Sequence, residues 1–64
     1  MKYELFYQHK VWHKDQVQKI EVFKLHTAST EFSRLMRLPG VLYVRMFEDK
    51  KLVAEYREGG LYEL

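Results

Sequence analysis

The sequence predicts a small α+β domain in which four strands and one helix follow one another in the order β-β-α-β-β. Three patterns support this fold class. Residues 2–12 alternate between apolar and polar side chains, as a strand of a half-buried sheet does. Residues 27–38 place apolar side chains at helical spacing. Two further alternating runs, 41–47 and 52–57, are typical of a closing pair of strands.

The composition limits what such a chain can be. It has 64 residues, of which 47% are hydrophobic and none is cysteine. A chain this short buries a small core, and without disulfides it is commonly stabilised by association. The formal net charge of +2 at pH 7 is too small to indicate a polyanionic partner. Because the sequence shows neither an apolar run of membrane-spanning length nor a signal peptide, we expect one cytoplasmic domain over residues 1–64.

The first two strands come before the helix. In the strand over 2–12, Phe6 and Trp12 project from the face that polar residues otherwise occupy. Polar residues at 13–16 turn the chain into a second strand over 17–25. Its alternation changes phase near Val22-Phe23, as at a β-bulge or where both faces are partly covered. The helix side of the first strand is expected to hold Tyr3, Leu5 and Tyr7.

The helix has sequence signals at both ends. Thr27 is the expected N-cap, because its hydroxyl can accept a hydrogen bond from an unpaired amide of the first turn. Pro39 ends the helix by steric exclusion, and Gly40 eases the exit of the chain. One apolar stripe of the helix is expected to face the sheet, and it holds Ala28, Phe32, Leu35 and Met36.

The last two strands form a hairpin. The runs 41–47 and 52–57 are joined by the polar residues 48–51. Gly59-Gly60 breaks the last strand, so residues 59–64 are expected to form a flexible or docking tail. The helix side of the hairpin is expected to hold Leu42, Val44, Met46, Leu52, Ala54 and Tyr56.

The position of the helix predicts the order of the strands. A helix between the second and third strands makes these two parallel, through a right-handed crossover. The fourth strand is then expected between them, and the first pairs with the second as a hairpin. The sequence therefore predicts a four-stranded, mainly antiparallel sheet in the order 3-4-2-1, with the helix on one face.

One short helix covers only one face of such a sheet, and we call the opposite face the open face. Aromatic and apolar side chains alternate onto it among basic residues. Monomers rarely expose a large apolar patch, and protein interfaces are enriched in aromatic residues and Arg. We therefore expect a partner-binding surface that holds Phe6, Trp12, Tyr43, Arg45, Phe47 and Val53.

Three uses of the open face are compatible with the sequence. It can bind a protein, either another partner or a second copy in a homodimer; an exposed edge strand of the sheet is the alternative surface for a protein partner. It can bind single-stranded nucleic acid, because Tyr43, Arg45 and Phe47 alternate on one strand like the base-stacking residues of sheet platforms. It can also be covered by the chain's own residues 61–64. Protein binding fits best, since the chain has neither a Gly-rich aromatic RNA-binding signature nor a strong basic excess.

Catalytic and metal-binding patterns are weak. His9 and His13 have a spacing that aligns two ligands on a helix, but this segment is predicted as strand and turn. His26 precedes the helix and is expected to be a turn residue. Glu48 and Asp49 lie at a hairpin tip, which offers no pocket. We therefore expect a protein that is not an enzyme and takes no metal, cofactor or small-molecule substrate.

Part of the sequence resembles ferredoxin-like modules such as heavy-metal-associated domains. Residues 38–56 are similar to their helix-to-hairpin half, through Leu38-Pro39-Gly40-Val41, Val44 and the run 50–56. Those domains bind metal through a pair of cysteines, which this chain lacks. The resemblance implies a split β-α-β geometry without a metal function.

A larger part of the chain resembles the Dmd-like phage antitoxins. Its size, its β-β-α-β-β order, Trp12 late in the first strand and the turn at 49–51 are similar to theirs. Those proteins inhibit a host RNase toxin by binding it. The resemblance implies a phage or mobile-element regulator that inhibits a host or toxin protein by occupying its surface.

Overall fold

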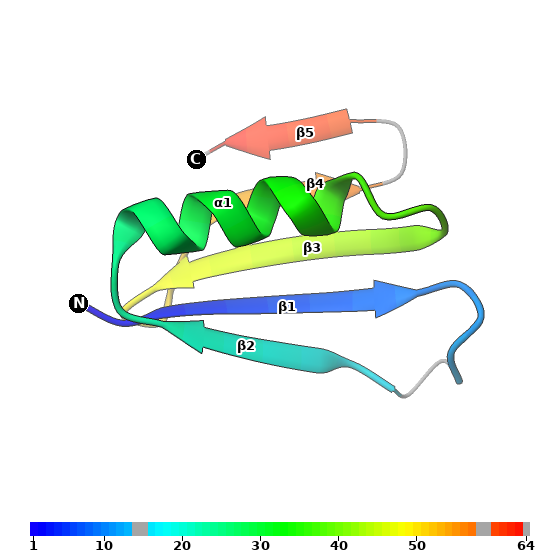
Figure 1. Ribbon diagram of the computed structural model, residues 1–64, viewed down its shortest axis with the longest axis horizontal. Helices are drawn as coiled ribbons and strands as arrows, with labels where there is room; N and C mark the ends of the chain where they lie inside the picture. Colours follow the sequence, from blue (N-terminus) through cyan, green and yellow to red (C-terminus); the bar gives the residue numbers. More distant parts are fainter. Residues whose placement is uncertain (14–15, 58–59, 64) are drawn as a thin grey trace.

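The computed structural model describes residues 1–13, 16–57 and 60–63, the last three of these as backbone only. In this part of the chain one helix lies on one face of a five-stranded sheet (Figure 1). The elements are β1 (Tyr3–His9), β2 (Gln18–Val22), α1 (Leu25–Met36), β3 (Val41–Glu48), β4 (Lys51–Arg57) and β5 (Gly60–Glu63).

The α+β class and the β-β-α-β-β succession are confirmed, but the predicted spatial order is wrong. The observed order is β2-β1-β3-β4-β5, and every pair of neighbours is antiparallel. It is β1, and not the fourth strand, that separates the parallel strands β2 and β3. With a strand on each side, β1 is an interior strand, and its Tyr3 and Leu5 side chains are only 3% and 0% exposed.

The C-terminal segment adds an edge strand to the predicted set. Residues 60–63, expected as part of a tail, pair antiparallel with β4 as β5. Residues 14–15 of the first turn, and residues 59 and 64 of the tail, lie outside the described residues.

The core lies between α1 and the sheet. Leu5, Leu35 and Val44 are fully buried, one each from β1, α1 and β3. The helix packs mainly on β3 and β1. Burial of each such side chain contributes about 1.5–3 kcal/mol. The predicted helix stripe is confirmed, because Ala28, Phe32 and Leu35 are buried and Met36 packs against them.

The helix begins earlier than its expected cap. Its N-cap is Lys24, and the Ala28 amide donates to the Lys24 carbonyl at 3.0 Å. Thr27 therefore lies within the first turn and is not the N-cap. The second strand correspondingly ends at Val22, because the chain leaves the sheet at Phe23, whose side chain is 68% exposed.

Two β-bulges change which side chains face the helix. A register shift between Gln8 and His9 leaves Leu42 as the extra residue of β3, so Val41 is buried and Leu42 is exposed. A second shift pairs Phe47 with Leu52 and makes Val53 the extra residue of β4. A bulge re-aims the side chains beside it. The inward positions predicted for Leu42 and Leu52 are corrected accordingly.

A tight turn at Pro39 and Gly40 joins α1 to β3. The Val41 amide donates to the Leu38 carbonyl at 3.3 Å, and Gly40 has a φ of +85°. Pro in second and Gly in third position are typical of a type II turn. The His9 ring packs against Gly40, and its Nε2 lies 2.7 Å from the Pro39 carbonyl oxygen. The end of β1 is thereby tied to this turn.

Replacing Gly40 with alanine should destabilise the fold. The new Cβ would lie 2.6 Å from His9 Cε1, at a backbone φ of +85°. The left-handed conformation alone costs ~1–2 kcal/mol, so the free energy of unfolding in urea should fall by at least ~1 kcal/mol. In a His9→Ala background the steric contact is gone, so Gly40→Ala should cost less. Unchanged stability of the single variant would contradict this role of Gly40.

Replacing Lys50 with glycine should stabilise the fold. The hairpin between β3 and β4 turns at Asp49 and Lys50, with φ values of 48° and 72°. Two-residue hairpin turns with two positive φ values favour Asp or Asn followed by Gly. Lys50→Gly should therefore raise the free energy of unfolding by ~1 kcal/mol, whereas Lys51→Gly, inside β4, should lower it. A loss of stability on Lys50→Gly would contradict the inference that the positive φ of Lys50 strains the turn.

Candidate functional site

The open face is built by alternation along the central strands. Because Leu5, Val44 and Met46 point into the core, their neighbours along β1 and β3 point to the opposite side of the sheet. This places Phe6 and Arg45 directly opposite each other across the β1–β3 pair. Four of the six predicted partner-binding residues lie together there: Phe6, Tyr43, Arg45 and Phe47.

An aromatic pair occupies the middle of the open face. The rings of Phe6 and Phe47 are 5.6 Å apart and meet edge to face at 88°. Such pairs contribute ~0.5–1.5 kcal/mol beyond the burial of their area. Both rings are half-buried, so part of each remains in contact with solvent.

Arg45 is held in place from two sides. Its guanidinium lies 4.4 Å above the ring centroid of Tyr43. Its Nε donates to a carboxylate oxygen of Glu55 at 2.7 Å, from the residue directly opposite on β4. A guanidinium that is both stacked and hydrogen-bonded has a fixed orientation.

The Glu55 carboxylate balances the basic residues on the β4 side of the open face. Arg57 approaches its second oxygen at 3.2 Å. The hydrogen bond from Arg45 is the main cause that lowers the pKa of Glu55, with Arg57 adding to it against the opposing effect of desolvation. Glu55 therefore stays ionised below the usual range of a glutamate.

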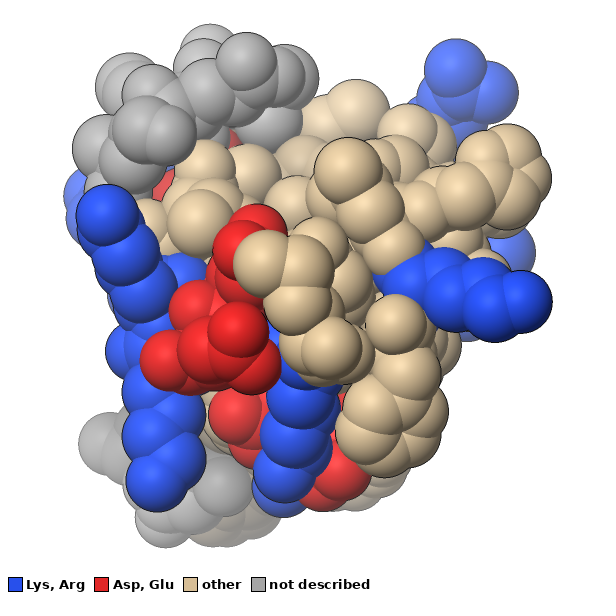
Figure 2. Space-filling model, turned by 90° about the vertical axis from the view of Figure 1, so that its left-hand side faces the viewer, with Lys and Arg blue, Asp and Glu red and all other residues tan. Residues whose placement is uncertain are grey.

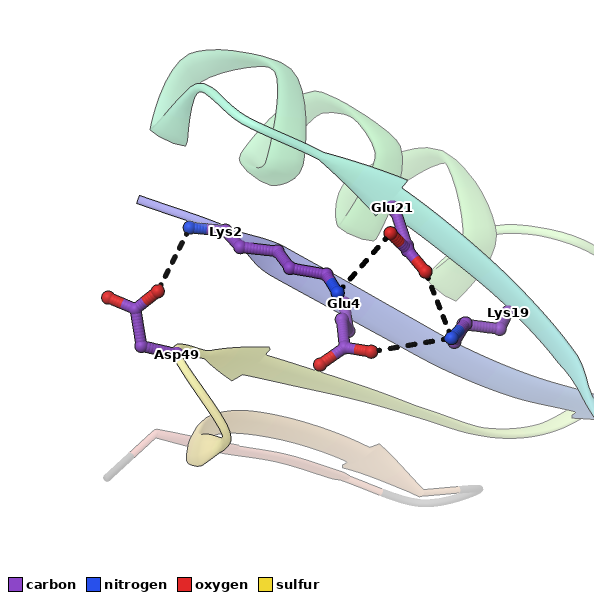
Figure 3. Close-up of polar contacts among 5 residues, drawn as sticks. All are labelled: Lys2, Glu4, Lys19, Glu21 and Asp49. Carbon is purple, nitrogen blue, oxygen red and sulfur yellow. Dashed lines mark hydrogen bonds and ion pairs between the residues drawn. The ribbon is translucent and has the colours of Figure 1, made fainter.

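Charged residues also gather at the β2 side of the sheet. Figure 2 views the end where β2 passes into α1, and shows acidic side chains with basic ones beside them. Figure 3 shows the contacts: Lys19 Nζ lies 2.9 Å from Glu21 and 3.5 Å from Glu4. Lys2 approaches Glu21 at 3.5 Å, and its backbone amide donates to Asp49 at 3.0 Å.

This charge cluster compensates an unfavourable pairing. Glu4 and Glu21 are directly opposite each other in the β1–β2 pair, and like charges at such positions are destabilising. Lys19 bridges the two carboxylates. The hydrogen bond and the charge of Lys19 lower the pKa of Glu21, and the same contact raises the pKa of Lys19.

Trp12 and Val53 do not join the other four predicted residues. Trp12 lies beyond the end of β1, and its ring packs against those of Tyr7 and His9, with centroids 5.4 and 6.0 Å away. Tyr7 packs against the core, on the helix side. Val53 also packs against the core, because the bulge in β4 re-aims it. Their expected place on the open face is therefore corrected.

Of the two candidate metal ligands, His9 uses its side chain in structural contacts. The His9 ring accepts the Val11 amide hydrogen at Nδ1 (3.2 Å), so Nε2 is the nitrogen that donates to Pro39. Both ring nitrogens are thus used within the chain. His13 is exposed, and its backbone carbonyl accepts a hydrogen bond from the Gln16 amide. Among the described residues, no group of three or more His, Asp or Glu side chains is arranged to hold a metal ion.

A surface hollow along α1 shows no arrangement for nucleophilic catalysis in its described contacts. The Thr30 hydroxyl donates to the His26 carbonyl at 3.0 Å, as polar side chains inside helices often do. Arg34 is bonded to Glu31 one turn earlier, at 2.6 Å. The residues that line the hollow are Ser29, Thr30, Ser33, Arg34, Arg37 and Leu38.

Sequence reasoning missed the acidic members of the site. Glu4 and Glu21 contact Lys19, and Glu55 contacts Arg45, yet of these residues only Arg45 was among the predicted partner-binding residues. The parity of Glu55 with Arg57, and its distance from the 49–50 turn, could have identified it as the partner of Arg45.

Comparisons of the chain with protein-family models, curated proteins and solved structures gave no match. The resemblances to antitoxins and to ferredoxin-like modules therefore stay predictions. In the described part of the chain, α1 is the sole helix, and it is too short and too polar to cross a bilayer.

The Glu55 contacts should make stability depend on pH. Because the pKa of Glu55 is lower in the folded chain than its ordinary value of 4.5, its contribution is complete above that pH and is lost as the pH falls through the folded value. Urea unfolding of wild type should therefore show decreasing stability in this acid range. Glu55→Gln should reduce that dependence, with a remainder from Glu21. Identical pH profiles of the two proteins would contradict the Arg45 contact.

Proposed function

We propose that this chain is a non-enzymatic protein-binding domain that contacts its partner through the open face. One observation supports the proposal above others: the half-buried Phe6–Phe47 pair and the Tyr43–Arg45 stack lie side by side on the uncovered side of the sheet. Interface cores are enriched in aromatic residues and Arg, and their rims are polar. The Glu55 and Lys19 contacts supply such a rim.

The contacts within the surface favour binding by lowering its entropic cost. The ring contact between Phe6 and Phe47 restricts the orientation of both side chains, and Tyr43 and Glu55 restrict that of Arg45. Side chains that are already ordered lose less freedom when a partner docks. The surface is therefore suited to rigid docking.

Charge distribution argues against nucleic acid as the partner. Glu4, Glu21 and Glu55 are interleaved with the basic residues, and each has an ion-pair contact. The Nε of Arg45 is already bonded to Glu55, so that carboxylate offsets the positive charge that a phosphate would meet. Proteins that bind single strands instead have a groove of net positive charge.

A non-enzymatic domain would act on its partner by occupying the partner's surface. We therefore propose a regulator or inhibitor, the mode that the antitoxin resemblance implies. Its target is a protein with an apolar patch bordered by charged residues, since such a patch complements the ring pair and its flanking ion pairs.

Substitutions on the open face should weaken partner binding. Immobilised wild-type chain should retain a protein from a lysate of the source cells, and purified partner then allows affinities to be measured. Tyr43→Ala should weaken binding by about 30-fold, which corresponds to ~2 kcal/mol for a hot-spot residue. Trp12→Ala and Thr27→Ala are matched controls away from this face, and should bind like wild type.

Two results would overturn the proposal. One is wild-type affinity of both Tyr43→Ala and Phe47→Ala, with circular dichroism showing that they are folded. The other is binding of single-stranded DNA or RNA at low salt that weakens steeply as salt is added, which indicates phosphate contacts.

A further inference from the structure

Beyond the open face, the β2 edge of the sheet has the properties of a self-pairing surface. β2 is the outermost strand on its side, so one row of its backbone amides and carbonyls has no neighbouring strand among the described residues. Unprotected edges of this kind pair with other strands. We propose that β2 pairs antiparallel with β2 of a second copy, about a two-fold axis at Ile20.

The sequence of β2 is complementary to itself in this register. With Ile20 opposite Ile20 of the second copy, Lys19 lies opposite Glu21 and Gln18 opposite Val22. Opposite charges at directly opposed positions are stabilising. Because the axis is two-fold, the Lys19–Glu21 pair occurs twice.

Neighbouring registers are unfavourable. Moving the axis by one residue, to Lys19 or to Glu21, would place identical charges opposite each other at the centre. Like charges directly opposed are destabilising. Among these three registers, the one centred on Ile20 matches every charge. The same charges disfavour foreign strands that lack the matching pattern.

Apolar residues just outside β2 extend the match. Val17 and Phe23 are 45% and 68% exposed, and they become directly opposed if the strand lengthens by one residue at each end. Ile20 and Val22 are only partly buried, because α1 packs mainly on β3 and β1. Pairing would cover all four side chains, on both faces of the edge.

Pairing leaves every charge of the cluster with a partner. Lys19 now contacts Glu21 and Glu4 of its own chain. An ammonium group has three donors, so Lys19 can keep Glu4 and also reach Glu21 of the second copy. The two sheets become one continuous sheet with both helices on the same face. This extra burial is a common remedy for a chain of 64 residues without cysteine.

Charge-reversal variants test the proposal by sedimentation at chain concentrations from about 10 μM to about 1 mM. Wild type should form a species of twice the chain mass. Lys19→Glu and Glu21→Lys should each raise the dissociation constant at least about tenfold, because like charges then oppose each other twice. A mixture of the two variants should associate again, since the strand of one variant then carries two acidic residues and faces two basic residues on the strand of the other.

Two results would overturn the proposal. One is a wild-type chain that stays monomeric at every concentration, as expected if the edge accepts only a strand of another protein. The other is a dimer whose dissociation constant neither single variant raises. Phe47→Ala alters the open face and should dimerise like wild type. The β2-edge dimer can therefore be disproved without disproving partner binding by the open face, and the reverse.

A cross-link tests the axis independently of charge and of how well the reversal variants fold. Directly opposed strand residues have Cα atoms about 4.5–5.5 Å apart, within the range of a disulfide. Because the chain has no cysteine, Ile20→Cys should oxidise to a covalent dimer. Ser29→Cys, exposed on α1, should not. Equal rates of cross-linking would exclude the two-fold axis at Ile20.

Discussion

The contact of one helix with one face of the sheet is the constraint on which the rest of the structure depends. Leu35 of α1 is fully buried with Leu5 of β1 and Val44 of β3, and these side chains hold the layers together. A helix of 12 residues spans only about 18 Å, at 1.5 Å per residue. It therefore covers only the central strands on one face of the sheet. The opposite face and both edges must be stabilised by other contacts.

The open face is stabilised by contacts among its own side chains. Phe6 and Phe47 bury part of each other, and Arg45 is held between Tyr43 and Glu55. On the other side, Lys19 offsets the opposed carboxylates of β1 and β2. These contacts order the side chains of the open face in the free chain. The same side chains would contact a docking partner.

The sequence was informative where local pattern decides the structure. Alternation located four of the five strands, and the stripe from Ala28 to Met36 located the buried side of α1. It was less informative where distant segments compete. The order of the strands depends on how segments far apart in the sequence pair, and here β1 pairs with β2 on one side and with β3 on the other. Such pairing cannot be read from the pattern of one strand.

The composition of the open face was predicted only in part, because the regular alternation of a strand fails at strand ends and bulges. Phe6, Tyr43, Arg45 and Phe47 keep the parity of regular strands, so they lie together as expected. Trp12 lies past the end of β1, and Val53 lies at a bulge, so parity no longer applies to either. Bulges and strand ends arise from pairing with other strands. They leave only weak signals in the residues that they displace.

The most direct test of this account measures the solvent access of the two sheet faces by NMR, with a soluble paramagnetic probe added to the free chain. The ring protons of Phe6, Tyr43 and Phe47 should relax faster on addition of the probe, whereas the methyl groups of Leu5, Leu35 and Val44 should be unaffected. Equal protection of the three rings and of these methyl groups would show that the open face is covered, and would contradict the account.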